Sequence, residues 1–281
     1  MTIATLLVSC PDRTGIVAAM SDFVFRHGGN IVDLDQHADA DTGQFCMRLS
    51  FDARGFRLDR DGIRAALAVL AKSYDMSWEL AWSDERPRVA VFCTKAPHCL
   101  YDLLLADKLG ELAGDIVLVV SNHRELEPVA AHFAVPFVHI PTDDKARAEA
   151  AQAELLERER IGLVVLARYM QILSPAFVRP RLGRIINIHH SFLPAFVGAK
   201  PYHQAKARGV KLIGATAHYV TEELDQGPII EQAVTRVSHR DSVEDMIRKG
   251  RELERQTLTR AVRLHLERRV LITDNRTVVF A

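Results

Sequence analysis

Four nearly continuous apolar runs are the feature of this 281-residue sequence that most constrains its fold. They span residues 89–93, 116–120, 137–140 and 163–167, and stretches with helical character separate them. Strands buried on both faces have this continuous pattern, because helices cover both sides of a parallel sheet. The sequence therefore predicts an α/β domain with a mostly parallel sheet.

The rest of this half of the chain predicts further strands and one long helix. Three later apolar segments, at residues 185–188, 213–220 and 229–237, continue the series of strands. Residues 242–266 carry apolar side chains at helical spacing, which predicts an amphipathic helix. The chain then ends in a predicted hairpin whose turn contains Asp274.

The first part of the chain predicts a smaller α+β unit with the order βαββαβ. Thr14 is expected to cap the first helix through its hydroxyl group, and Gly28 to end that helix. This order gives an antiparallel, ferredoxin-like sheet with two helices on one face. The predicted strands are residues 5–10, 31–37, 44–51 and 76–81, and the second predicted helix is residues 60–73.

A short polar segment separates the two parts. Residues 83–87 read Ser-Asp-Glu-Arg-Pro, a composition typical of linkers. We therefore predict a first domain over residues 1–83, a linker over 84–88 and a second domain over 89–281.

Composition argues against several classes of function. The 36 basic and 36 acidic residues give a formal net charge of +0, so no basic excess indicates nucleic acid. The apolar runs are too short to cross a bilayer, and the N-terminus lacks a signal-type core. Cys10, Cys46, Cys93 and Cys99 have neither CxxC nor metal-ligand spacing, so we expect free thiols. These features predict a cytoplasmic protein with no nucleic-acid or membrane partner.

Polar side chains gather where predicted strands end. Asn187, His189 and His190 follow one strand, Arg168 follows another, and Asp225 lies in a later turn. In an open parallel sheet, ligands bind outside the carboxyl ends of the strands. An amide N–H can hold a developing oxyanion, a histidine can move a proton, and a carboxylate can orient the histidine. This combination of groups indicates attack on a carbonyl.

Other interpretations of these residues stay open at this point. Asn-x-His after a strand and Asp-x-Gly are both common in plain turns and caps. His189, His190, His203 and His218 suggest a metal site, yet no pair has HExxH spacing and no cysteine joins them. His218 lies inside an apolar strand, where a buried, hydrogen-bonded histidine is equally expected. Ser191 lacks the G-x-S-x-G turn of a nucleophile. We therefore expect no metal.

Three segments, in order, resemble the signatures of folate-dependent formyltransferases. Residues 187–198 read NIHHSFLPAFVG, and residues 218–230 read HYVTEELDQGPII. Residues 166–173, LARYMQIL, resemble the strand and loop that line the folate pocket of that family. The resemblance implies a Rossmann-like formyltransferase-fold domain in the second part of the chain. It also implies three catalytic residues, Asn187, His189 and Asp225.

Over essentially its whole length the chain resembles the formyltetrahydrofolate deformylases. The resemblance implies hydrolysis of 10-formyltetrahydrofolate to formate and tetrahydrofolate, which supplies formate for purine synthesis and balances the one-carbon folate pool. Folate is then the substrate, and no cofactor is expected. The implied substrate-binding residues are Arg168, Met170, Gln171, Leu173, His190, His203, His218 and Gly227.

The first part of the chain is similar to an ACT domain, with Pro-Asp-Arg-Thr-Gly at residues 11–15 as the first-loop signature. This similarity implies regulation by glycine and methionine, and a homo-oligomer in which exposed strand edges are covered. The implied effector-binding residues are Asp12, Arg13, Thr14, Gly15, Asn30 and Ile31.

One turn favours water over a phosphorylated amine as the formyl acceptor. Glycinamide ribonucleotide formyltransferases have a glycine- and serine-rich loop around the substrate phosphate, where backbone N–H groups approach the oxygens. Residues 93–99 read CTKAPHC, with no glycine and with a proline that has no N–H. Three alternatives remain: formyl transfer to an amine such as glycinamide ribonucleotide or an amino sugar, an inactive binding module, and a metal-dependent amidohydrolase.

Overall fold

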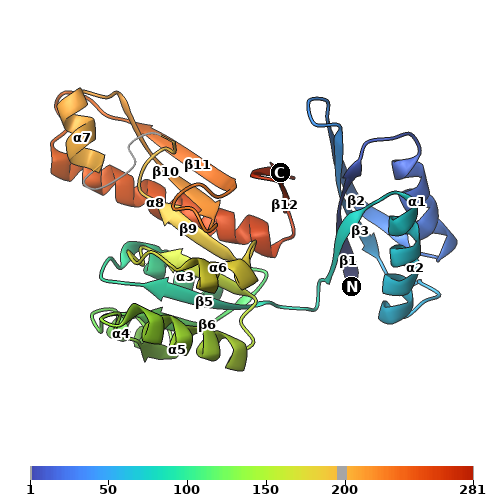
Figure 1. Cartoon of the computed structure of the whole chain (residues 1–281), viewed down its shortest axis with the longest axis horizontal. Coiled ribbons are helices and arrows are strands. Elements are labelled where there is room, and N and C mark those ends of the chain that lie inside the picture. Colours follow the sequence, from blue (N-terminus) through green and yellow to red (C-terminus); the bar gives the residue numbers. More distant parts are fainter. Residues whose placement is uncertain (1, 195–200, 281) are drawn as a thin grey trace. The chain divides into compact units, whose positions relative to one another are not determined.

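The computed structural model describes residues 2–194 and 201–280 (Figure 1). The chain divides into two compact units. Unit 1 contains the residues up to Arg86 together with 268–273 and 277 onward, and unit 2 contains Pro87–Glu267 with Asp274–Arg276. The first division falls inside the predicted linker. Residues 195–198, the end of the 187–198 segment that resembles the formyltransferase signature, lie outside the described residues.

Unit 1 has the predicted βαββαβ order. Its four strands form an antiparallel sheet in the order β2-β3-β1-β4. The elements are β1 (Ile3–Pro11), α1 (Ile16–Arg26), β2 (Asn30–Asp39), β3 (Gln44–Asp52), α2 (Arg60–Ser73) and β4 (Ser77–Trp82).

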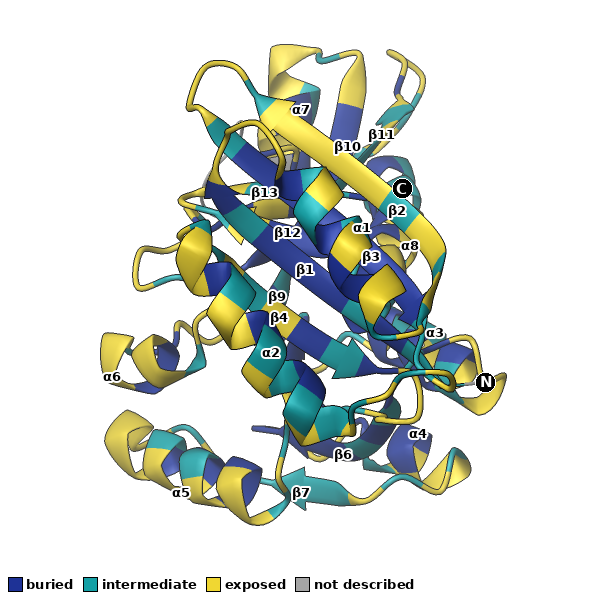
Figure 2. Ribbon diagram, turned by 90° about the vertical axis from the view of Figure 1, so that its right-hand side faces the viewer, coloured by how far each residue is buried: buried dark blue, intermediate teal, exposed yellow. Residues whose placement is uncertain are grey.

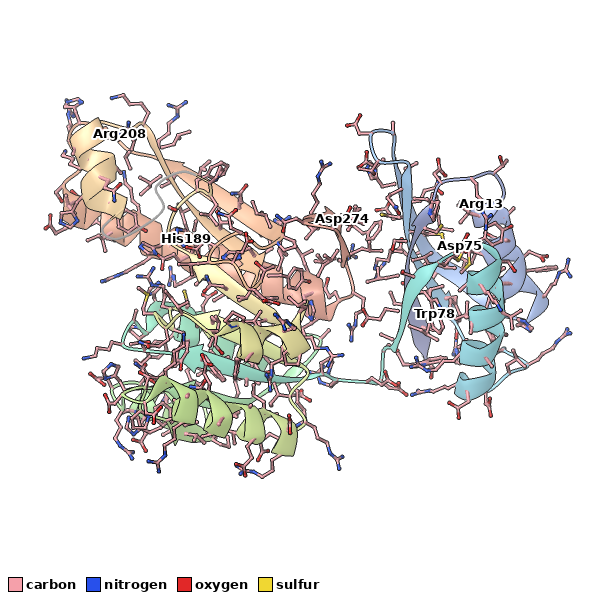
Figure 3. The ribbon with its side chains drawn as sticks, viewed as in Figure 1. Arg13, Asp75, Trp78, His189, Arg208 and Asp274 are labelled. Atoms are coloured by element: carbon pink, nitrogen blue, oxygen red, sulfur yellow. The ribbon has the colours of Figure 1, made fainter. Side chains whose placement is uncertain are left out.

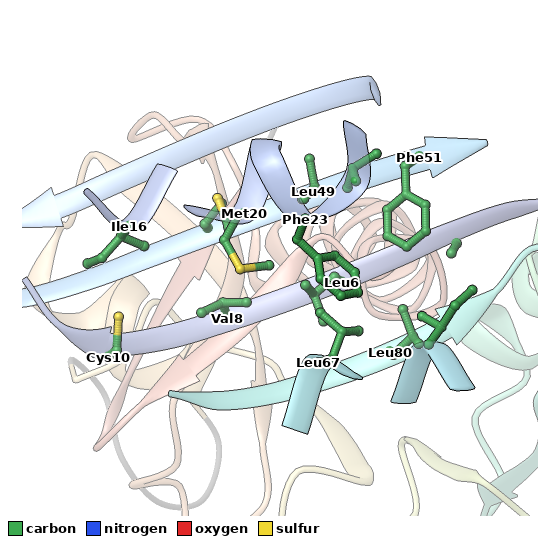
Figure 4. Packing of buried hydrophobic residues seen from close by; sticks show 14 of the residues in the cluster. Leu6, Val8, Cys10, Ile16, Met20, Phe23, Leu49, Phe51, Leu67 and Leu80 are labelled. Atoms are coloured by element: carbon green, nitrogen blue, oxygen red, sulfur yellow. The ribbon is translucent and has the colours of Figure 1, made fainter. Parts of the chain in front are cut away.

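The core of unit 1 lies between the sheet and its two helices (Figure 4). Alternate residues of β1, such as Leu6 and Val8, are buried against Met20 of α1 and Leu67 of α2. Both helices have one buried and one exposed face (Figure 2).

The expected cap of α1 by Thr14 is wrong. The residue before the helix is Gly15, whose φ of 95° is left-handed, and no side chain caps the helix. Glycine adopts this conformation without a steric penalty, so the turn from β1 into α1 is set by Gly15. The predicted stop at Gly28 is confirmed: α1 ends at Arg26, and Gly28 has a φ of 83°.

The C-terminal hairpin belongs to unit 1, whereas the sequence placed it in the second domain. It consists of β12 (Val270–Thr273) and β13 (Arg276–Val279). Leu271 and Phe280 are buried against Leu7 and Cys46, on the face of the sheet away from the helices. A short alternating sequence predicts a hairpin but not the surface on which it packs, so this partner was not predictable.

Unit 2 is an α/β layer structure around a seven-stranded sheet in the order β11-β10-β9-β8-β5-β6-β7. Strands β5 to β9 are parallel, and β10 is antiparallel to both β9 and β11. The strands are β5 (Arg88–Cys93), β6 (Asp115–Ser121), β7 (Phe137–His139), β8 (Leu163–Ala167), β9 (Ile185–His189), β10 (Leu212–Tyr219) and β11 (Ile229–Arg236). The helices are α3 (His98–Lys108), α4 (Glu127–His132), α5 (Lys145–Arg158), α6 (Pro175–Val178), the 3-10 turn η1 (Arg179–Arg181), α7 (Pro201–Arg208) and α8 (Val243–Leu266).

The long helix α8 matches its prediction closely and packs on the sheet and on α3. The Ser242 hydroxyl accepts from the backbone N–H of Asp245, and the Asp245 carboxylate accepts from the backbone N–H of Ser242. These two hydrogen bonds form a capping box. No helix in the described part of the chain is both long and apolar enough to cross a membrane.

The strand register brings the predicted site together. Leu166 of β8 lies beside Asn187 of β9 in the parallel pair, so Arg168 and His189 follow at the same sheet edge. Because β10 runs antiparallel to β9, its residue His218 lies beside Asn187. The carboxyl end of β10 therefore points away from that edge.

Candidate active site

A cavity of about 640 Å³ lies in unit 2. Loops after β8, β9 and β10 line it, together with the start of α3 and parts of α7 and α8. Asn187, His189 and Asp225 all contribute to its wall. Figure 3 shows His189 at the end of β9. The three residues predicted to be catalytic therefore meet at one cavity.

His189 has one ring nitrogen bound and the other free for a ligand. Its Nδ1 lies 3.2 Å from Oδ2 of Asp225, and both side chains are about nine-tenths buried. Its Nε2 is buried and has no hydrogen-bond partner among the described residues. A carboxylate that accepts from Nδ1 fixes the tautomer with Nε2 available at the cavity.

Asn187 is oriented by His218. Nδ2 of Asn187 lies 3.2 Å from Nε2 of His218, and Nδ1 of His218 lies 2.9 Å from the carbonyl oxygen of Tyr219. Because a carbonyl can only accept, Nδ1 of His218 carries the proton, and in the neutral ring Nε2 accepts from Asn187. The second amide hydrogen of Asn187 remains available for a carbonyl oxygen in the cavity.

Asp225 reaches the site from the loop after β10, not from a strand end. Its backbone is left-handed, with a φ of 57°. The hydrogen bond from His189 is the main cause that holds the pKa of its carboxyl well below the usual range, and it outweighs the opposing effect of burial. His218 is a second contributor, with Nε2 lying 3.7 Å from Oδ1 of Asp225. Asp225 therefore stays ionised beside His189.

The predicted substrate-binding residues separate into three groups. Arg168, Met170, Gln171, His190 and His203 line the large cavity. Leu173 and His218 line a smaller pocket of about 90 Å³, which shares Gln171, Asn187 and Asp225 with the large one. Gly227 lines neither pocket. A Cβ there would lie 1.7 Å from the carbonyl oxygen of Tyr219, so this glycine permits close packing of the loop.

His190 is a neutral member of the cavity wall. Burial, and then the charge of Arg168, lower its pKa to about 4. Its ring centroid lies 5.2 Å from that of His189. Of these two neighbouring rings, His190 is neutral and His189 is the one paired with a carboxylate, that of Asp225.

A buried group centred on Glu254 of α8 was not predicted from the sequence. Oε2 of Glu254 lies 2.8 Å from Nε2 of His98, and Oε1 accepts from the hydroxyl of Tyr202 at 3.1 Å. All three residues line the large cavity. The available signal was the position of Glu254, which lies beside Leu253 and four residues before Leu258 on the buried face of an amphipathic helix. A carboxylate there needs partners.

His98 and Glu254 also belong to the group of potential metal ligands found among the described residues, with Cys99 as its third member. Their ligand atoms lie within 4.8 Å of one another. Burial raises the pKa of the Cys99 thiol well above its usual value. Nε of Arg168 lies 3.5 Å from Oε2 of Glu254, and this positive charge opposes a cation. The four cysteines are free and buried.

The turn over residues 93–99 presents a side chain, His98, to the cavity. Pro97 precedes helix α3, and no side chain caps the helix. Ala96 and His98 line the cavity, and His98 is bonded to Glu254. This arrangement differs from an open loop of backbone N–H groups around a phosphate.

The predicted effector-binding residues occupy two opposite ends of the unit 1 sheet. Asp12 to Gly15 follow the end of β1, where Pro11 pairs with Gln44. Asn30 pairs with Asp52, which also pairs with Ile3 at the start of β1. Eight residues of extended chain separate these ends by roughly 26 Å. Within one copy, therefore, the two sets do not meet.

Arg13 makes contacts of its own within unit 1 (Figure 3). Its guanidinium donates to the carbonyl oxygen of Ser73 and lies 4.5 Å from the ring centroid of Tyr74. It is therefore positioned by α2 and the residue after it.

Comparison with known proteins agrees with this fold. The formyl transferase family model matches residues 87–262. The formyltetrahydrofolate deformylase of Synechocystis sp. is 52% identical over 99% of this chain and 98% of its own. The crystal structure of a formyltetrahydrofolate deformylase from Pseudomonas syringae pv. tomato has a TM-score of 0.98 at 49% identity, and covers 100% of this chain and 95% of its own. That of glycinamide ribonucleotide transformylase 1 from Symbiobacterium toebii has a TM-score of 0.67 at 32% identity, over 72% of this chain and 98% of its own.

An open α/β sheet with this family signature defines unit 2 as a formyltransferase-type domain. The chain belongs to the formyl transferase family and, over its full length, to its formyltetrahydrofolate deformylases.

Proposed function

We propose that this chain hydrolyses 10-formyltetrahydrofolate to formate and tetrahydrofolate. The observation that carries the proposal is His189, which is bonded to Asp225 through Nδ1 and free at Nε2 in a cavity that Asn187 also lines. Full-length relatives named formyltetrahydrofolate deformylase support the choice of substrate. The release of formate for purine synthesis, and a balancing effect on the folate pool, are part of this proposal.

Each of the three residues has a distinct role in this mechanism. Asn187 donates a hydrogen bond to the formyl oxygen as water attacks the formyl carbon. His189 takes a proton from the attacking water at Nε2, and the charged ring then stabilises the same oxygen and gives the proton to the folate nitrogen, whose bond to carbon breaks. Asp225 keeps His189 in this orientation and tautomer. No cofactor or metal takes part.

Water is favoured over an amine as the formyl acceptor, because the start of α3 presents side chains to the cavity instead of open backbone N–H groups. His98 and Tyr202 both bond to Glu254 there. An amine acceptor that carries a phosphate would need donors that the Pro97 turn does not offer. Formyl transfer to glycinamide ribonucleotide is therefore the weaker alternative.

Formate release from 10-formyltetrahydrofolate alone tests the proposal. The unaltered protein should release formate without added amine, and a chelator should not stop it. Asp225→Asn should lower kcat by a factor on the order of a thousand or more, because the His189 tautomer is no longer enforced. If formate appears only after an amine is added, the protein is a transferase; loss of activity to the chelator would indicate a metal-dependent amidohydrolase.

We infer that unit 1 is an ACT-type regulatory domain that binds glycine or methionine in a homo-oligomer. Its βαββαβ order and the Gly15 turn support the ACT assignment. A second copy is one way to bring Asp12–Gly15 close to Asn30 and Ile31, which lie at opposite sheet ends in one copy. The ten-residue edge strand β2 is largely exposed (Figure 2) and offers a pairing surface.

Light scattering and titration with each amino acid test this inference. An oligomer that binds glycine or methionine, with binding weakened by Asn30→Ala, supports it. A monomer that binds either amino acid with full affinity would show that no second copy is needed. Fractionation of cells tests the predicted cytoplasmic location.

A further inference from the structure

The guanidinium of Arg168 is a buried charge with unused hydrogen-bonding capacity. Its side chain is 18% exposed, and it lines the large cavity. Nε and Nη1 are buried, and neither has a hydrogen-bond partner among the described residues. Arginine cannot lose its proton, so unfilled donors of this kind are costly unless a ligand binds them.

Glu254 compensates the charge of Arg168 without occupying its donors. Nε of Arg168 lies 3.5 Å from Oε2 of Glu254, which is too far for a strong hydrogen bond. His98 and Tyr202 already bond to the two oxygens of Glu254. Burial opposes ionisation of Glu254, but His98 and the charge of Arg168 together hold its pKa below the usual value. The ion pair is therefore not the two-bond fork in which arginine normally holds a carboxylate, and the buried donors Nε and Nη1 stay without a hydrogen-bond partner among the described residues.

The backbone places Arg168 at the same edge of the sheet as His189. Its φ is 62°, a left-handed conformation that a non-glycine residue adopts at a cost. The β8–β9 register places it two residues beyond Leu166, as His189 is two residues beyond Asn187. The two strands are about 4.8 Å apart. Arg168 thus follows the same sheet edge as the proposed catalytic histidine.

We propose that Arg168 binds the formate product of the reaction through two parallel hydrogen bonds, and that Glu254 is the positioning residue that keeps the guanidinium in place. The inference rests on the proposed hydrolysis, in which water adds to the formyl carbon, the carbon–nitrogen bond breaks, the folate nitrogen takes one proton, and formate and a second proton are released. A carboxylate therefore forms at the carbon attacked beside His189. A buried guanidinium with unfilled donors suits this ligand.

The folate glutamate is a second candidate carboxylate for Arg168. The glutamate is the charged end of folate and favours contact with solvent, whereas the guanidinium is mostly buried beside the neutral His190. Arg251 also lines the cavity but is exposed, and it is better placed for such an end.

Titration of the folate-free protein with sodium formate, followed by calorimetry or by NMR of labelled formate, tests the site without any turnover. The unaltered protein should bind formate, and Arg168→Gln should weaken this binding roughly ten- to a hundredfold, as expected for a charge-assisted pair. Arg168→Gly removes the side chain but suits the left-handed backbone, so it gives the same result if Gln impairs folding. Arg251→Gln, the matched control on the same cavity, should retain formate binding.

Kinetics separate the possible outcomes. Formate should inhibit the initial rate of the unaltered enzyme and of Arg251→Gln, but not that of Arg168→Gln. Glu254→Gln should change the affinity for formate without a comparable change in the affinity for tetrahydrofolate. If Arg168→Gln instead weakens tetrahydrofolate binding and leaves formate binding intact, Arg168 holds the glutamate and the proposal is wrong. Formate binding in a protein that releases no formate would contradict the proposed function but not the anion site.

Discussion

At the residue scale, function in unit 2 depends on which hydrogen-bonding atoms are bound by the protein and which remain for a ligand. Nδ1 of His189 is bound by Asp225, while Nε2 faces the cavity without a partner among the described residues. Asn187 shares one amide hydrogen with His218 and keeps another. A polar atom left unbound at a buried site has a high free energy until a ligand satisfies it, which favours binding of a polar reacting group.

Loss of the Asn187 amide should slow the reaction itself. Asn187→Ala should lower kcat by roughly a hundred- to a thousandfold, because one donor to the developing oxyanion is removed. Steady-state measurement of formate release gives kcat and KM separately. Asn275→Ala, in the exposed turn between β12 and β13, is the matched control and should leave both values unchanged. An equal loss in the control would show that the effect is not specific to the site.

The neutral His190 should make the fold sensitive to acid. Its pKa is 6.5 in an ordinary setting and about 4 in the folded protein. Between these values the unfolded chain binds a proton that the folded chain does not, so stability falls as pH falls across this window. Urea unfolding at several pH values should show that His190→Gln removes part of this decline, on the order of 1 to 3 kcal/mol. Identical pH profiles would show that His190 titrates normally.

At the element scale, Gly250 lets helices α7 and α8 approach each other. A Cβ at this position would lie 1.9 Å from the hydroxyl oxygen of Tyr202 and 2.4 Å from its ring carbon Cζ. The glycine therefore makes room for Tyr202, whose hydroxyl bonds to Glu254. Glycine inside a helix normally costs about 1 kcal/mol relative to alanine, so packing outweighs helix propensity here.

A pair of substitutions tests this close approach. Gly250→Ala should destabilise the protein by roughly 1 to 3 kcal/mol, because Tyr202 must shift. In a Tyr202→Ala background the same change should be neutral or stabilising by up to about 1 kcal/mol, since only helix propensity remains. Thermal or urea unfolding of the four variants measures both values. The same cost in both backgrounds would show that Tyr202 is not the obstacle.

At the scale of the whole molecule, unit 1 is built from both ends of the chain, because the C-terminal hairpin packs on its sheet. The hairpin of β12 and β13 covers the sheet face opposite α1 and α2, where Leu271 and Phe280 are buried against Leu7. The chain up to Arg86 alone would expose that apolar face to water. Residues 1–86 are therefore not a complete folding unit.

Removal of the Phe280 side chain should show that unit 1 depends on the hairpin for its stability. Phe280→Ala should lower the free energy of unfolding of unit 1 by roughly 3 to 5 kcal/mol, as for a large side chain removed from a core. Phe25→Ala, in the same unit but with a side chain 78% exposed, is the matched control and should change it little. Urea unfolding followed through Trp78 and Trp82, both in unit 1, reports on this transition. Equal effects of the two substitutions would mean that the hairpin does not support the unit.

Several features of this protein were determined by the sequence alone. Continuous apolar runs predicted the buried strands β5, β6 and β8, because strands covered on both faces need no polar side. The predicted bounds of α2 and α8 agree with the structure to within a residue, and the apolar spacing of α8 repeats as expected for a helix with one buried face. The carboxyl ends of parallel strands lie at one edge of the sheet, so the sequence alone predicts Arg168 and His189 at the same edge.

Other features were decided only by the tertiary structure. The antiparallel course of β10, the backward reach of Asp225 and the packing of the hairpin on unit 1 depend on contacts between segments far apart in sequence. The Glu254 group assembles from α3, α7, α8 and the loop after β8, so no local pattern contains it. Hydrophobic periodicity records which side of a segment is buried. The partner that buries it, and the polar atoms left free in a cavity, follow from packing in three dimensions.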